Sequence, residues 1–141
     1  DLTNLHVDPS DKADRDAAKR KVFSYHRLTT GHDFRSCLAS GHLFTIGFTV
    51  YSNMWSMRAG VLTMPAGSPQ GGHCIAVISY DDDFRNSEWA QWAGFTVPEK
   101  VYICQNSWGT GWGRGGLFAV DSSYFENPYL AGDAWTVRCP S

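Results

Sequence analysis

Residues 105–113 read Gln-Asn-Ser-Trp-Gly-Thr-Gly-Trp-Gly, and this stretch contributes most to predicting the fold and the site. Upstream of it, Gly71-Gly72-His73 opens a run of apolar, β-forming residues. An amide oxygen that accepts one ring N–H of a histidine orients the imidazole without forming an ion pair with it. The two motifs therefore predict that His73 and Asn106 meet in the folded chain as a catalytic pair.

The residues around this pair favour two neighbouring β-strands. Residues 74–80 read Cys-Ile-Ala-Val-Ile-Ser-Tyr, and residues 101–104 read Val-Tyr-Ile-Cys. Both runs have the composition of buried strands, so His73 lies at the start of one strand and Asn106 at the end of another. Glycine accepts positive φ angles and close backbone approach. We therefore expect Gly72 and Gly109 to support the site and Trp108 to cover it.

The rest of the chain predicts an α+β fold with mostly antiparallel strands. Apolar residues recur at helical spacing in residues 34–38, and residues 43–51 alternate as a strand does. Two further short strands are expected at 117–120 and 134–138. One short helix before five strands predicts a small barrel-like sheet.

The first residues are expected to form a separate segment. Residues 1–16 are polar and rich in aspartate, which predicts an extended arm. Residues 14–25 contain helix formers but few apolar positions, so any helix there should be weak. Residues 17–141 are then expected to form a single domain.

These motifs resemble those of the papain-like cysteine peptidases, family C1, and match the second, β-barrel domain of that fold. Residues 34–51 are also similar to the helix-then-strand segment of its bacterial and viral members, with Leu43 in place of the usual proline. The resemblance spans residues 17–138. It implies that Trp108 shields the bond between Asn106 and His73 from water, and that Cys74 and Ile46 line the pocket for the acyl-side residue of the substrate.

The nucleophile of such a peptidase has no match in this sequence. The Gln-Gly-x-Cys-Gly-x-Cys-Trp signature is absent, although the reaction needs a thiolate. Cys74 should point away from the ring of His73, because successive strand residues face opposite sides. Cys37 and Cys104 lie in apolar runs and are interpreted as core residues. Cys139, near the end of the chain, could pair with an external thiol.

Composition and charge argue against several other classes. A chain of 141 residues, 43% of them hydrophobic, suits one modest domain and is shorter than a two-domain papain-like enzyme. A net charge of −2 is not the footprint of a nucleic-acid or anionic-membrane binder. No apolar run approaches the ~18 residues of a membrane span. The single, scattered cysteines predict no metal site, and no cofactor is expected.

We therefore expect the His73- and Asn106-bearing chain of a papain-like cysteine peptidase that hydrolyses peptide bonds. Its Cys-bearing half would be a separate chain, so that this chain alone is inactive. The start at Asp1 indicates proteolytic processing, although a partly cloned chain would begin the same way. Since the two domains of the family pack face to face, apolar surface should be exposed on the His73 face. The alternative is a non-catalytic structural or binding module, such as a virion or assembly component, derived from such a peptidase.

Overall fold

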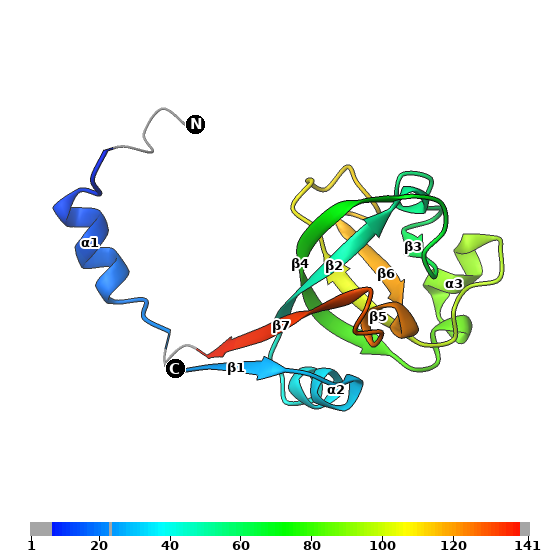
Figure 1. The fold of residues 1–141 in the computed structure, drawn as a ribbon, viewed down its shortest axis with the longest axis horizontal. Helices are drawn as coiled ribbons and strands as arrows, with labels where there is room; N and C mark the ends of the chain where they lie inside the picture. Colours follow the sequence, from blue (N-terminus) through cyan, green and yellow to red (C-terminus); the bar gives the residue numbers. More distant parts are fainter. Residues whose placement is uncertain (1–6, 23, 139–141) are drawn as a thin grey trace.

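The computed structural model describes residues 7–22 and 24–138, which form a curled seven-stranded sheet with four short α-helices (Figure 1). The strand order is β1-β7-β2-β4-β5-β6-β3, and every neighbouring pair is antiparallel except β3 and β6. The strands are β1 (Ser24–Leu28), β2 (Phe44–Tyr51), β3 (Val61–Leu62), β4 (Pro69–Asp81), β5 (Val101–Gln105), β6 (Leu117–Asp121) and β7 (Ala131–Arg138). The helices are α1 (Asp11–Ala18), α2 (Gly31–Ala39), α3 (Glu88–Ala93) and α4 (Ser122–Phe125), with 3-10 turns η2 (Ser52–Met54) and η3 (Phe84–Asn86). The predicted fold class is confirmed.

The five predicted strands are present as β2, β4, β5, β6 and β7, whereas β1 and β3 were not expected. Strand β1 occupies the edge of the sheet and is largely exposed, so its sequence carries no alternation of apolar and polar residues. Strand β3 has only two residues, both buried. Neither strand is long or periodic enough to be recognised from sequence, and both are defined by their partners, β7 and β6.

The N-terminal segment differs from the extended arm predicted for residues 1–16. Helix α1 covers most of its described part, and the Ser10 hydroxyl caps it by accepting a hydrogen bond from the backbone N–H of Ala13 at 3.3 Å. The helix buries none of its residues and stands away from the barrel (Figure 1). Only local interactions, among them this cap and the i,i+4 ion pair between Lys12 and Asp16, therefore support the helix.

The main core fills the curl of the sheet. The inward-facing residues of β2, among them Phe44 and Ile46, are fully buried. Helix α2 covers one end of this core, where Phe34 stacks on Phe44 with ring centroids 5.0 Å apart. The Arg35 guanidinium, from the same helix, donates to the Tyr102 hydroxyl at 2.9 Å. This contact fixes α2 against β5.

A second, smaller core lies under the segment between β4 and β5. That segment was predicted only as an aromatic insertion, and it forms η3 and α3, which contribute the buried side chains of Phe84 and Ala90 to this core. Trp92 of α3 is 82% exposed. In the described part of the chain, no helix has the length and apolar character needed to cross a membrane.

Candidate active site

His73 lies early in β4, where that strand pairs with β2. Its cross-strand partner is Phe48, and the two ring centroids are 6.0 Å apart. Phe48 is buried, so the imidazole lies against the edge of the core. The imidazole is itself half-buried. The register of two strands, which local sequence does not determine, sets the position of the ring.

Asn106 follows directly after β5 and reaches the imidazole. Its Oδ1 lies 3.0 Å from Nε2 of His73. The same oxygen accepts the backbone N–H of Ser107 at 2.8 Å, which identifies it as an acceptor and therefore makes Nε2 the protonated nitrogen. Asn106 is only 6% exposed. The predicted contact between the two side chains is present, and it leaves Nδ1 of His73 as the nitrogen available to a thiol.

A series of aromatic rings covers this hydrogen bond. The Trp108 ring stacks on the His73 ring, with centroids 5.0 Å apart and planes inclined by 23°. Trp112 meets Trp108 edge-on at 5.1 Å and rests in turn on Phe118 of the core. Trp108 thus lies against the ring of the polar pair, and Trp112 supports it on the side of the core.

Trp55 extends this stack and was not predicted. Its ring lies 5.5 Å from that of Trp108 at an angle of 17°, and it is 61% exposed. It belongs to the turn after β2, a segment with no periodic pattern around it. Its exposure next to a predicted site residue becomes visible only in the folded chain.

The glycines of the two motifs have different roles. Gly109 has a φ of +83° and its carbonyl accepts the backbone N–H of Trp112 at 3.3 Å, so it forms the turn that returns Trp112 toward Trp108. A side chain at Gly72 would meet no atom within 4 Å. The backbone approach expected at Gly72 is therefore not seen, and the glycine instead leaves the surface beside His73 open.

A shallow groove of about 430 Å³ runs along the open side of His73. Gly72 lines it together with Gly47 and Thr49 of β2, and residues 128–133 form its far wall. The pocket role predicted for Ile46 does not fit, because alternation along β2 turns this side chain into the core, where it is 0% exposed. Gly47, the next residue, faces the groove in its place.

Three of the four cysteines lie in the described part of the chain, and they differ in exposure. Cys74 is exposed and pairs with Gly47, whereas His73 pairs with Phe48, so thiol and ring face opposite sides of β4. Cys37 and Cys104 are buried, and burial raises the pKa of the Cys104 thiol. Cys139 lies outside the described residues. Within those residues no group of His, Cys, Asp and Glu side chains is arranged to hold a metal ion.

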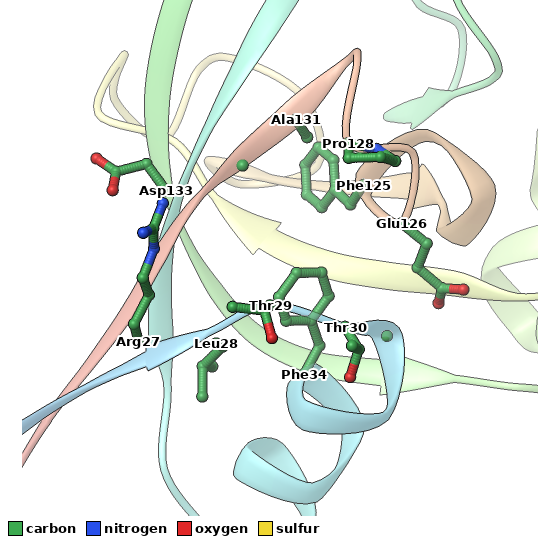
Figure 2. A pocket seen from close by; sticks show the side chains of 12 residues that line it. Arg27, Leu28, Thr29, Thr30, Phe34, Phe125, Glu126, Pro128, Ala131 and Asp133 are labelled. Atoms are coloured by element: carbon green, nitrogen blue, oxygen red, sulfur yellow. The ribbon is translucent and has the colours of Figure 1, made fainter.

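A larger hollow of about 580 Å³ lies on the other side of residues 128–133 (Figure 2). Phe34 and Phe125 face each other across its floor, and Arg27 and Glu126 stand on opposite rims. None of the predicted site residues lines it. The hollow is as large as it is because the β1–α2 loop and α4 stand apart. The candidate catalytic residues lie instead beside the groove at His73.

Comparison with known proteins agrees with this geometry. A family model described as papain family cysteine protease matches residues 6–131. An uncharacterized peptidase C1-like protein of Acanthamoeba polyphaga mimivirus is 28% identical over 98% of this chain and 44% of its own length. The crystal structure of xylellain, a cysteine protease from Xylella fastidiosa, superposes with a TM-score of 0.71 at 30% identity, over 94% of this chain and 46% of xylellain. The bromelain protease of Ananas comosus, at 20% identity and a TM-score of 0.59, shares the fold.

The chain thus spans less than half the length of both the viral relative and xylellain. The matched part contains the imidazole, the carboxamide and the tryptophan that covers them.

Proposed function

The chain belongs to the papain family of cysteine proteases, and we propose that it is the His- and Asn-bearing half of a peptidase whose thiolate comes from a separate Cys-bearing chain. One observation supports this most directly: Nε2 of His73 and Oδ1 of Asn106 are 3.0 Å apart under the Trp108 ring, with Nδ1 unused. By itself, the chain is inactive.

Each group has a defined chemical task in this proposal. Nδ1 of His73 takes the proton of the incoming thiol, which gives a thiolate and an imidazolium. The thiolate attacks the carbonyl carbon of a peptide bond, and the imidazolium returns the proton to the leaving amine. Asn106 accepts from Nε2 throughout and keeps the ring oriented without adding a charge. Trp108 excludes water from that hydrogen bond.

A chimaera can test this proposal. The half of xylellain that this chain does not match, which family resemblance makes the Cys-bearing half, is placed before residues 1–141. A peptide epoxide should label the cysteine of the xylellain half. His73→Ala should slow labelling by at least about 10²-fold, because the thiol loses its base. His32→Ala, which removes an exposed histidine of α2, serves as the matched control and should leave the rate unchanged.

The rival function is the non-catalytic module derived from a peptidase. It predicts a chimaera that folds with a cooperative thermal transition and yet reacts with the epoxide no faster than the His73→Ala variant does. That result would exclude the catalytic proposal and leave the pair as a structural feature of the barrel.

A further inference from the structure

A hollow of about 350 Å³ lies beside α3, which stands next to β3 at the end of the sheet away from β1 (Figure 1). This α3 hollow is lined by Ala59, Trp89, Trp92, Gly113 and Arg114. It shares no lining residue with the groove of the candidate active site or with the larger hollow of Figure 2. The proposed peptidase chemistry therefore does not account for it.

Trp89 forms a fixed wall of the α3 hollow. Its Nε1 donates to the backbone carbonyl of Ala59 at 2.7 Å. Its ring also packs closely against Gly60, where an added Cβ would lie 3.2 Å from Cζ2 of the indole. Ala59 and Gly60 have φ angles of +51° and +69°, so the turn that receives the indole has an uncommon backbone conformation. Trp89 is thus held in one orientation by the barrel itself.

Trp92 lines the same hollow but is not covered. It lies three residues after Trp89 on α3, and residues at this spacing share one side of a helix. Ala90 and Ala93 are the residues of α3 that are buried in the smaller core. Trp92, by contrast, is 82% exposed. A ligand that covers this ring would remove a large apolar area from water.

Arg114 supplies the charge of the α3 hollow. Its guanidinium carbon lies over the Trp89 ring, 5.0 Å from the ring centroid. This cation–π contact does not use the five N–H donors of the guanidinium. In the described part of the chain no carboxylate forms an ion pair with Arg114. The donors are therefore available to an anion from outside.

The lining selects among ligand classes. Arg114 is its single ionisable side chain, and the lining has no carboxylate or side-chain amide. A sugar would find no side-chain acceptor for its hydroxyl groups. A carboxylate matches one guanidinium, and an aromatic group beside that carboxylate matches the exposed indole. The combination that fits is a carboxylate next to an aromatic ring.

We propose that the α3 hollow binds an acidic peptide segment, with a carboxylate on Arg114 and a neighbouring aromatic side chain on Trp92. Small-molecule sites usually bury most of their ligand, whereas here one wall is largely exposed. An open site of this kind suits a chain that passes across it and continues in both directions. The proposal goes beyond the proposed function and does not depend on it, because binding requires only residues of this chain.

Titration of the 141-residue chain with the peptide Ac-Ala-Asp-Phe-Ala-NH2 tests the site. Indole N–H signals are followed by ¹H–¹⁵N NMR and assigned through Trp→Phe variants. The Trp92 signal should shift with a dissociation constant on the order of 1 mM, since one ring contact and one charged pair hold the peptide. Trp55, which is 61% exposed beside the candidate active site, is the internal control and should not shift.

Two further probes separate charge and ligand source. Ac-Ala-Asn-Phe-Ala-NH2 has the same shape without the charge and should bind at least about tenfold more weakly. The free acid 3-phenylpropionate carries the same two groups without a peptide chain and should also bind more weakly than the Asp peptide. Equal binding of the free acid would reject the peptide as occupant in favour of a small aromatic acid.

Arg114→Ala should lower the affinity for the Asp peptide at least about tenfold, because the carboxylate loses its partner. Arg27→Ala is the matched control and should leave it unchanged. Arg27 also lies over a tryptophan ring, that of Trp135 at 5.9 Å, and has no ion pair among the described residues. Circular dichroism shows whether each variant is folded, and the comparison of Asp and Asn peptides needs no protein variant.

Three outcomes would overturn the proposed site. Equal affinities for the Asp and Asn peptides would remove the role of charge. A Trp92 signal that does not move would remove the ring contact. A shift of the Trp55 signal without one at Trp92 would place the peptide beside the candidate active site instead.

Discussion

At the scale of single residues, the direction of one amide decides the chemistry of the site. Asn106 presents Oδ1 to His73 because the same oxygen also accepts the Ser107 backbone N–H. The amide therefore cannot offer its NH₂ group to the ring without losing that bond. The tautomer of His73 follows from this, and with it the nitrogen that can meet a thiol.

Asn106→Ala in the chimaera should lower the turnover of a peptide substrate by about 10²-fold with little change in KM, because the ring is no longer held in its reactive orientation. Asn106→Asp tests the charge instead. A carboxylate next to the ring stabilises the imidazolium, so the alkaline limb of the pH–rate profile should move to higher pH. A profile that does not move would argue against direct contact between residue 106 and the ring in the working enzyme.

At the scale of elements, the loop between β5 and β6 carries Trp108 and Trp112, and Gly113 is one of the glycines with positive φ on which it depends. Gly113 has a φ of +59°, and a Cβ built on it would lie 2.3 Å from the carbonyl oxygen of Leu117. Gly111, two residues earlier, has no atom within 4 Å of the same position. The two positions are therefore not equivalent, although both belong to the same Trp-Gly-x-Gly-Trp-Gly run.

Gly113→Ala should lower the free energy of unfolding by about 1–3 kcal/mol, through backbone strain and the clash with Leu117. Gly111→Ala should change it by less than about 1 kcal/mol. Urea unfolding of the 141-residue chain measures both. Equal effects of the two substitutions would contradict this account of the loop.

The start of α2 depends on a capping box. The Thr30 hydroxyl accepts the Asp33 backbone N–H, and the Asp33 carboxylate accepts the backbone N–H groups of Thr29 and Thr30, each at 2.9 Å. The backbone hydrogen bond from Thr29, more than any other contact, lowers the pKa of Asp33 below its ordinary value of 3.8.

The stability that the Asp33 carboxylate contributes depends on pH. Because the folded-state pKa is the lower one, the contribution is fully present above the unfolded-state pKa and is lost as the pH falls through the folded-state pKa. Asp33→Asn should therefore destabilise the chain at pH 7, and the difference from wild type should shrink below about pH 4. Thermal unfolding of both proteins over this range provides the measurement. A difference that stays constant with pH would mean that the carboxylate charge is not involved.

At the scale of the whole molecule, the barrel holds its own core and leaves two regions unsupported. Phe44 and Tyr102 are fully buried, whereas α1 buries no residue and the edge strand β1 is largely exposed. Stability should therefore be concentrated in the central strands.

Deletion of residues 1–20 should change the free energy of unfolding by less than about 1 kcal/mol, since an isolated eight-residue helix contributes little. Phe44→Ala, by contrast, should cost about 3–5 kcal/mol through the cavity that it leaves. Urea unfolding of the two variants and of the wild type measures both changes in the free energy of unfolding. A large loss on deletion would show that α1 packs on the barrel in solution.

The sequence by itself determined the motifs around His73 and Asn106, the α+β class and five of the strands, because these depend on residue type and on alternation along a single segment. It could not place β1, whose exposed edge position leaves no pattern, nor Trp55, whose contact with Trp108 joins two separate loops. The choice of Gly47 over Ile46 at the groove also came only with the structure, since strand register decides which of two successive residues faces the site. The tertiary structure likewise gave the tautomer of His73, because that depends on which atom of Asn106 meets the ring, and distances between atoms of different strands are not encoded in any local pattern.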